Sequence, residues 1–413
     1  MGRDKLLTDF QNTRDFTEAI CKPLAIDDYQ IQSIDQTSPP KWHLAHVSWF
    51  FETFVLSEFS SNYTPFRSGY DYLFNSYYYT HGKMHPRPER GLLSRPTVAE
   101  IYDYRHAIDR QVKALIMQDN DTSWPELENR IRLGLQHEQQ HQELLLMDIK
   151  HNFSVNPLKP AYRELRQPPS GETAPTQWLE REGGLHSIGH HGEGFAFDNE
   201  TPRHSVLLFD HRLADRFVTN EEYLAFIEDD GYSQPALWLA DGWTLLQNLQ
   251  WQHPLYWSKR NSEWAQFTLA GMRPLNSNEP VCHLSYYEAD AYARWAGKRL
   301  PREEELEVTL AEQTVRGNFV DDDLLHPAPA GDQGQWYGDL WAWTCSPYHA
   351  YPGFKPLSGT MGEYNGKFMS SQMVLKGGSC ATTAEHTRAS YRNFFYPNER
   401  WMFSGVRLAE DAE

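Results

Sequence analysis

Apolar residues recur at intervals of three and four along much of the first 155 residues, which is the pattern of amphipathic α-helices. The clearest such segments are 41–56, 97–116 and 127–151. Ser38 and Pro39 predict a cap and a first-turn proline ahead of the first segment, and Thr97 with Glu100 predicts a capping box before the second. With a further helix expected near the N-terminus, the pattern predicts a four-helix bundle.

The pattern changes after this region. Residues 156–176 are rich in proline and polar residues and show no periodicity, so we interpret them as a linker. Residues 177–413 contain short apolar segments, many glycines and many tryptophans, with helices expected in 219–229 and 285–301. The predicted organisation is therefore a helical bundle over 1–155, a linker over 156–176 and a compact α+β domain over 177–413.

Composition narrows the class of protein. The 413 residues include 38 basic and 56 acidic side chains, and the resulting net charge of -18 disfavours nucleic acid and acidic membrane surfaces as partners. No apolar run resembles a secretion signal or a membrane span, so we expect a cytoplasmic protein. The four cysteines are widely scattered, which predicts no structural disulfide.

Three histidines are candidates for a metal site. His137 and His141 lie four residues apart on one predicted helix, so both imidazoles project from the same face. His46 shares an apolar stripe with Trp42 and Trp49 on another helix, and a bundle interior would bring the three together. Iron, zinc, copper and nickel all suit neutral imidazole, so spacing does not name the metal. The alternative is that they are core or surface histidines with satisfied hydrogen bonds.

The same helix carries a competing motif. His137-Glu138-Gln139-Gln140-His141 fits H-E-x-x-H, in which a zinc hydrolase uses the glutamate as general base. Zinc hydrolases of this type usually take their third ligand from beyond the helix, whereas His46 precedes it. The hydrolase is therefore the weaker of the two interpretations.

Several segments resemble the ergothioneine-type sulfoxide synthases. SPPKWHLAHVSWFFE and LQHEQQHQELLLMDIKH are similar to that family's two metal-binding helices, which belong to a DinB-like bundle. FAFDNETPRHSV, YYEADAYARWAGKRLP, GDLWAWTCSPY and VLKGGSC resemble the formylglycine-generating-enzyme (sulfatase-modifying-factor) fold, a relative of C-type lectins. The resemblance implies a DinB-like bundle followed by such a domain, with Fe(2+) held by His46, His137 and His141 and O2 as co-substrate.

The C-terminal resemblance alone would suggest formylglycine generation, which uses copper bound by a cysteine pair near the end of the chain. Only Cys380 lies beyond Cys345, so that activity is not expected. FNSYYYTHGKMHPRPERGLLSRP, GEYNGKF and NFFYPNERW resemble the family's subtype found outside actinobacteria. The C-terminal domain would then shape a substrate pocket.

The resemblance also implies roles for residues in the long loop between the second and third helices. Tyr77 and Tyr78 match a tyrosine pair, one of which would supply a proton or hydrogen atom in the oxygen-dependent step, a role that a phenol can fill. Arg87 and Arg90 lie in the family's basic segment, and guanidinium groups suit the carboxylate of a thiol substrate. The alternative is that Tyr77, Tyr78 and Tyr79 only pack against their neighbours.

Further residues match positions in the family's binding site for hercynine. Gln140 matches a glutamine that hydrogen-bonds the hercynine imidazole, although an exposed helical glutamine is the alternative. Asn393 and Phe394 match a segment that lines the site, where an aromatic ring suits a trimethylammonium group. Phe394-Phe395 stands where the actinobacterial subtype has Trp-Asp, which favours free cysteine over γ-glutamylcysteine as the thiol.

The activity implied is formation of a C–S bond between hercynine C2 and a thiol, giving a sulfoxide. Three alternatives stay open: a selenoneine synthase that uses a selenosugar, an ovothiol-type enzyme that acts on histidine, and a lectin-like binding module. The second usually carries a methyltransferase domain that this sequence lacks, and the third would have no use for three aligned histidines.

Overall fold

The computed structural model describes residues 2–118, 123–169, 171–332 and 334–412. The chain divides into two compact units. The first comprises residues 1–157 and the later segment 357–364, and the second comprises 158–356 and 365–413. No helix in the described ranges has the length and apolar character needed to cross a membrane.

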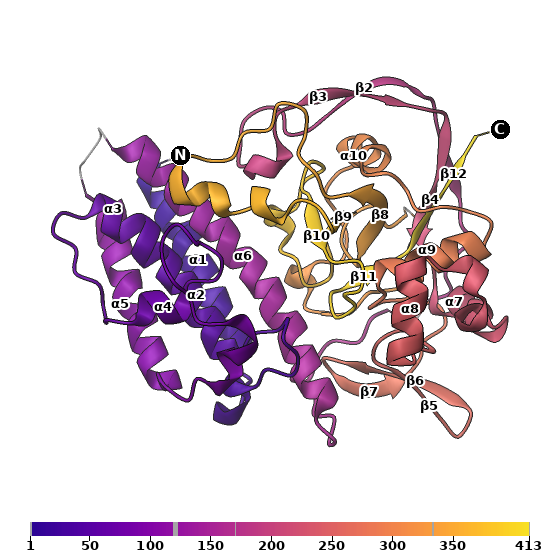
Figure 1. The fold of residues 1–413 in the computed structure, drawn as a ribbon, viewed down its shortest axis with the longest axis horizontal. Helices are drawn as coiled ribbons and strands as arrows, with labels where there is room; N and C mark the ends of the chain where they lie inside the picture. The colour runs from indigo at the N-terminus through magenta and orange to yellow at the C-terminus, as the bar shows by residue number, and fades with distance from the viewer. Residues whose placement is uncertain (1, 119–122, 170, 333, 413) are drawn as a thin grey trace. The chain divides into compact units, whose positions relative to one another are not determined.

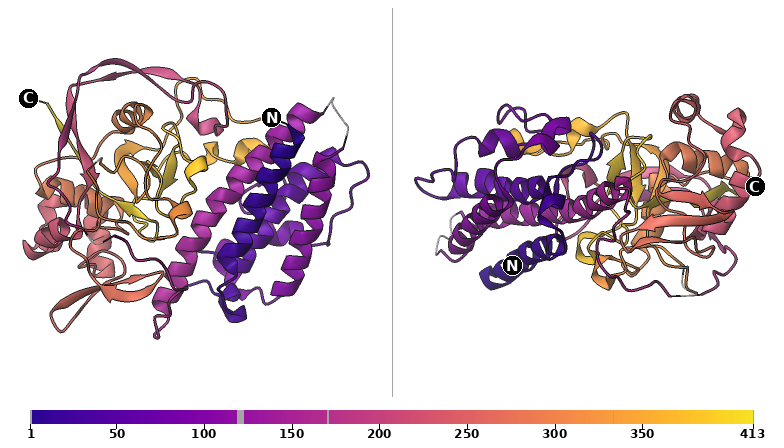
Figure 2. Two further views of the ribbon diagram at one scale, coloured as in Figure 1. Left: turned by 180° about the vertical axis from the view of Figure 1, so that it is seen from behind. Right: turned by 90° about the horizontal axis from the view of Figure 1, so that it is seen from below.

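The first unit is built on four long helices, which run side by side in Figures 1 and 2. They are α1 (Arg3–Cys21), α2 (Pro40–Phe51), α5 (Val98–Ile116) and α6 (Trp124–Val155). Helix α2 packs against α5 and α6, and α1 packs against α6. The long loop adds the short helices α3 (Ser57–Phe59) and α4 (Tyr70–Phe74), and α2 continues into a π-helical turn, Glu52–Leu56.

One predicted helix start is correct and one is wrong. Thr97 and Glu100 form the expected capping box at the start of α5. Ser38 does not cap α2, because Pro39 occupies the N-cap position without a side-chain bond. The Ser38 backbone N–H instead donates to Asp148, and its hydroxyl accepts from Arg90.

The second unit is a mixed α/β domain, and its described residues form four small sheets. One contains β1 (Trp178–Arg181), β4 (His211–Phe217) and β12 (Arg407–Asp411), and a second contains β10 (Asn393–Phe395), β9 (Met373–Lys376), β8 (Trp341–Pro347) and β11 (Ser404–Gly405). The others are β2 (Gly184–Ile188) with β3 (His204–Leu208), and β5 (Trp257–Arg260), β6 (Glu263–Thr268) and β7 (Gly271–Pro274). Its helices are α7 (Asn220–Glu228), α8 (Ala240–Leu249), α9 (Tyr286–Trp295) and α10 (Glu303–Ala311).

The segment that we interpreted as a linker, 156–176, is held partly against the second unit. The Tyr162 N–H donates to the Leu269 carbonyl at 2.8 Å, and the Thr173 hydroxyl donates to the Asn278 carbonyl at 2.8 Å. Such bonds satisfy backbone groups that a free connection would leave to water.

A close helix contact fixes the position of α6 beside α2. A Cβ added to Gly134 would lie 2.6 Å from Cε1 of Phe51 and 3.1 Å from Cε1 of Phe50. We therefore expect Gly134→Ala to lower the free energy of unfolding by about 1–3 kcal/mol, because overpacking outweighs the roughly 1 kcal/mol gain in helix propensity. Urea denaturation checks this result.

The matched control is Gly331→Ala, since a Cβ at Gly331 meets nothing within 4 Å. It should leave stability within about 0.5 kcal/mol of the parent. Equal stability of Gly134→Ala and the parent would show that α6 does not depend on this contact.

Candidate metal centre

Three imidazoles converge inside the first unit. His46 comes from α2 and His137 and His141 come from α6, and one ring nitrogen of each lies within 4.8 Å of the others. Nε2 of His46 and Nε2 of His137 are 3.2 Å apart. Two ligands at right angles on a metal, each at about 2.1 Å, would be about 3 Å apart, so the spacing suits chelation.

The bundle holds the His46 ring firmly. The ring lies between two indoles, 4.6 Å from Trp42 with a 12° tilt and 5.6 Å from Trp49 with a 17° tilt. Its Nδ1–H donates to the Phe74 carbonyl at 2.6 Å, so Nε2 carries the lone pair that faces His137. This matches the usual arrangement in metal sites, where the second nitrogen of a ligand histidine is fixed by a hydrogen bond.

Burial sets the charge of the three histidines. All are shielded from solvent, and burial is the main cause that lowers the pKa of His137 to about 3 and the pKa values of His46 and His141 well below the ordinary range. Neutral imidazole is the form that binds a metal. Nδ1 of His137 is buried and has no hydrogen-bond partner among the described residues. The donor set therefore fits a metal ion.

Glu138 cannot face such a metal as a general base. Its side chain is fully buried and pairs with Arg14 at 2.8 Å and Arg105 at 2.7 Å, while the Thr17 hydroxyl donates to it at 2.7 Å. Burial raises the pKa of Glu138, but Arg105 and Arg14 together lower it by more than burial raises it. The pKa is therefore below its ordinary value, and the carboxyl stays ionised. The arrangement gives Glu138 a structural role and argues against the zinc-hydrolase interpretation.

A group of aromatic and amide side chains lies beside the histidines. Tyr78 is fully buried, and its hydroxyl is 3.5 Å from that of Tyr77. The Tyr364 hydroxyl donates to Oε1 of Gln140, and its ring is 5.6 Å from that of His137 and 6.2 Å from that of Tyr77. The structure thus places Tyr77, Tyr78 and Gln140 near the metal-binding group.

Tyr364 is not among the site residues predicted from the sequence. Although it lies in the GEYNGKF segment, far along the chain, residues 357–364 pack with the first unit. Glu363 accepts the backbone N–H groups of Tyr79 at 3.0 Å and Thr80 at 2.9 Å, which ties this segment to the tyrosine loop. The family resemblance of GEYNGKF was the available signal for Tyr364.

The two predicted arginines have different surroundings. Arg87 is exposed and donates to the Gln36 carbonyl. Arg90 is buried, lies 3.4 Å from the centre of the Trp42 ring and donates to the hydroxyls of Ser38 at 2.9 Å and Ser76 at 3.1 Å. Only Arg90 therefore contacts a side chain that touches the metal-binding group.

The remaining predicted site residues lie in the second unit, on β10. Phe394 stacks on Tyr348 at 4.1 Å with an 11° tilt, and Phe395 meets Trp401 edge to face at 5.7 Å. Asn393 pairs with Leu375 of β9, and its side-chain oxygen accepts the Phe394 N–H at 2.9 Å. These residues form part of an aromatic sheet edge within their own unit.

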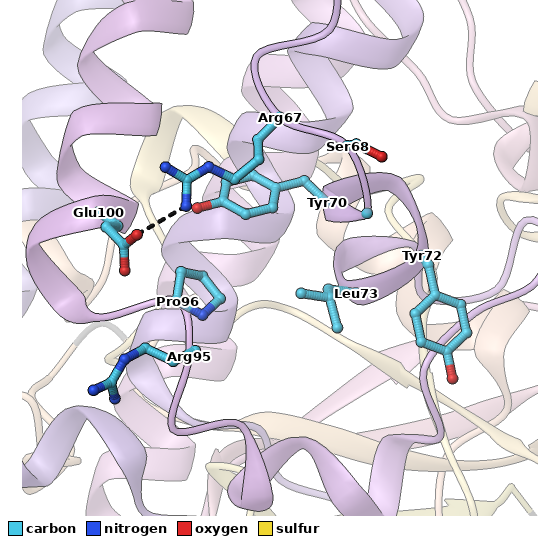
Figure 3. A pocket seen from close by; sticks show the side chains of 9 residues that line it. Arg67, Ser68, Tyr70, Tyr72, Leu73, Arg95, Pro96 and Glu100 are labelled. Atoms are coloured by element: carbon cyan, nitrogen blue, oxygen red, sulfur yellow. Dashed lines mark hydrogen bonds and ion pairs between the residues drawn. The ribbon is translucent and has the colours of Figure 1, made fainter.

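A pocket of about 440 Å³ opens elsewhere on the first unit, and Figure 3 shows its lining side chains. Arg67 pairs with Glu100 at 2.8 Å along one side, and Arg95 and Tyr72 lie around it. The lining includes none of the predicted site residues, so the metal-binding group is a separate feature.

The fold and site define a helical bundle with a buried three-histidine centre, joined to a mixed α/β domain. Comparison with known families identifies both parts. Residues 9–145 match the DinB superfamily, and residues 167–337 and 330–412 match the sulfatase-modifying factor enzyme 1-like domain. The latter matches cover more than half of the chain, so the chain belongs to this family. The predicted domain types and their order are confirmed.

Several known proteins are similar to this chain in amino-acid sequence. The chain is 34% identical over 249 residues to hercynine oxygenase of Mycolicibacterium thermoresistibile, covering 54% of this chain and 55% of that protein. It is 28% identical over 232 residues to ergothioneine biosynthesis protein 1 of Schizosaccharomyces pombe, covering 52% and 28%. It is 31% identical over 173 residues to the formylglycine-generating enzyme of Streptomyces coelicolor, covering 36% and 50%. The chain thus spans about half the length of the hercynine oxygenase that it matches.

Proposed function

We propose that the chain is an iron(II)- and O2-dependent sulfoxide synthase that joins hercynine C2 to the sulfur of a thiol, as in ergothioneine biosynthesis. The observation that carries the proposal is the buried group of His46, His137 and His141, which offers three neutral nitrogens to one ion. Similarity to hercynine oxygenases supports iron and the hercynine substrate, because spacing and burial alone suit several metals.

The reaction balances as a four-electron oxidation. Hercynine loses the C2–H hydrogen, the thiol loses its S–H hydrogen, and a C–S bond forms. One oxygen atom of O2 enters the sulfoxide, and the other leaves as water with the two hydrogens. Bound ferrous iron would supply the site where O2 binds and accepts the four electrons that the two substrates lose, and the side chains around it would orient the two substrates.

We assign substrate contacts to Gln140 and Arg90. Tyr364 donates to Oε1 of Gln140, which orients the amide so that its N–H groups are the donors toward the hercynine imidazole. Arg90 is a buried guanidinium hydrogen-bonded to neutral hydroxyls, and its Nε has no partner among the described residues. A carboxylate of the thiol would complete its bonding. Arg87 would then help to bind the same carboxylate from the exposed side of the loop.

The aromatic residues of the second unit fit a complementary role. Phe394 and Phe395 would offer aromatic ring faces to the trimethylammonium group of hercynine, with Asn393 as a polar neighbour. Phenylalanine instead of an acidic residue at 395 favours free cysteine as the thiol. This pattern is that of the subtype found outside actinobacteria.

Oxygen consumption by the iron-loaded protein tests the proposed function. Hercynine or a thiol alone should give slow uptake, and the pair should give fast uptake with a sulfoxide product. Cysteine, γ-glutamylcysteine and a selenosugar are compared as partners of hercynine, which separates the sulfoxide synthase from a selenoneine synthase. No turnover with any pair, despite bound iron, would contradict the proposal.

Loss of the acting tyrosine hydroxyl should change the product. Tyr78 is fully buried, and burial is the main cause that raises its pKa well above the ordinary range, so the hydroxyl holds its proton until it is needed. Tyr78→Phe or Tyr77→Phe is expected to lower sulfoxide formation about 100-fold, the usual scale of proton-transfer catalysis, with the thiol oxidised to a sulfinic acid instead. Mass spectrometry of the products measures both.

Tyr79→Phe is the matched control, because the Tyr79 side chain is 72% exposed and should leave the product unchanged. Unchanged product ratios in both the Tyr77 and Tyr78 variants would exclude this pair from the reaction.

A further inference from the structure

His43 bridges two residues of α6. Its Nδ1 is 2.9 Å from Nδ1 of the candidate ligand His141, and its Nε2 is 3.0 Å from Oδ2 of Asp148. Asp148 lies seven residues after His141, about 10.5 Å along the helix, so an imidazole from α2 fits between them and uses both of its nitrogens. All three side chains are buried.

The hydrogen bonds determine where the protons lie. Oδ2 of Asp148 also accepts the Ser38 backbone N–H at 2.7 Å, so this carboxylate oxygen acts as an acceptor. Nε2 of His43 must therefore donate to Asp148, and Nδ1 of a neutral His43 must accept. Among the described residues, the donor that lies opposite that nitrogen is Nδ1–H of His141. His141 is then left with its lone pair on Nε2, the nitrogen available to a metal.

We propose that Asp148 and His43 are positioning residues that fix the tautomer and orientation of His141 and strengthen it as a metal ligand. The reverse proton order, with His43 donating to His141, would place a proton on Nε2 of His141 and block coordination. Two of the three histidines thus have a hydrogen-bonded support: Asp148 through His43 for His141, and the Phe74 carbonyl for His46. Nδ1 of His137 has no partner among the described residues.

The inference rests on the metal site of the proposed function but not on the hercynine reaction. It concerns how tightly the site holds an ion and which nitrogen is protonated. Outer partners of ligand histidines typically change metal affinity 10- to 100-fold, which sets the expected scale.

Metal affinity of the full chain tests the proposal, with Zn(II) as the probe in competition with a chromophoric chelator. His43→Phe and Asp148→Asn should each raise the dissociation constant for Zn(II) about 10- to 100-fold. Phenylalanine keeps the bulk of the ring, and asparagine keeps the size of Asp148 while its amide can donate to His43 and reverse the proton order. Circular dichroism verifies that each variant is folded.

His151→Phe is the matched control, because His151 is also a buried histidine of α6 but bonds to Ser33. It should bind Zn(II) as tightly as the parent. If the parent binds Zn(II) but neither His43→Phe nor Asp148→Asn weakens binding, the inference is overturned while the metal site stands. If the parent itself binds no Zn(II), the metal site is overturned and the inference with it.

Nitrogen NMR of the Zn(II)-loaded parent gives an answer that does not depend on any variant folding. Long-range proton–nitrogen correlation should show His141 protonated at Nδ1 and His43 protonated at Nε2. A proton on Nδ1 of His43, or zinc bound through Nδ1 of His141, would overturn the inference.

Discussion

Replacing His46 with alanine is expected to abolish metal binding and turnover together. His46 is the only one of the three ligands that α2 supplies, and His137 and His141 alone would leave a two-nitrogen site. Iron content should fall from about one ion per chain to near zero after desalting, since three protein ligands are the usual minimum for a catalytic site. Elemental analysis and oxygen uptake with hercynine and cysteine measure the two losses.

His106→Ala serves as the control for this experiment. His106 lies on α5, its side chain is 50% exposed, and it pairs with Glu18 away from the ligand group. The control should keep full iron content and activity. Full iron content in a folded His46→Ala variant would show that the ligand set is wrong.

The second large effect is expected at Glu138. Glu138→Ala removes the carboxylate that pairs with Arg14 and Arg105, two arginines that are themselves almost completely buried. Breaking a buried ion pair by removing one partner costs about 3–5 kcal/mol. Arg14 keeps Asp109 and Arg105 keeps Glu18, so we expect a loss near the lower end of this range. A drop of this size in the free energy of unfolding would show as a much lower urea midpoint for the bundle.

Glu126→Ala is the matched control on the same helix. The Glu126 side chain is 72% exposed and reaches Arg130 only at 3.9 Å, so its removal should change stability by less than about 1 kcal/mol. A zinc hydrolase would instead need Glu138 for chemistry, and its removal would then cost activity with little loss of stability. That outcome would restore the hydrolase interpretation.

The ligand group could be predicted from the sequence because it depends on helical periodicity. His137 and His141 share a face by their spacing, and His46 lies on the apolar stripe of its own helix. The indoles of Trp42 and Trp49 belong to the same stripe, and the structure places them on both sides of His46. Burial of these stripes in one bundle brings the three imidazoles together.

The sequence pattern does not predict which individual side chains from distant segments form hydrogen bonds with one another. Tyr364 follows Gln140 by more than two hundred residues, and its segment has no periodicity that would place it with the helical unit. Asp148 shares a helix face with His141, but its hydrogen bond depends on His43 reaching across from α2. Such pairings are set by tertiary packing, which local patterns do not encode.

The two arginines illustrate the same limit. Arg87 and Arg90 are three residues apart in a loop, and the family resemblance of their segment gives both the same prediction. The structure buries Arg90 on the Trp42 ring and leaves Arg87 exposed. Arg90→Ala should therefore affect the site more than Arg87→Ala.

We propose that this chain uses O2 to make a C–S bond at hercynine C2. The most direct measurement is the mass of the product formed from hercynine and cysteine under 18O2 by the iron-loaded protein. The proposed reaction predicts a single adduct of the two substrates that carries one 18O atom, in the sulfoxide. An adduct without 18O, or labelled cysteine sulfinic acid with hercynine unchanged, would contradict it.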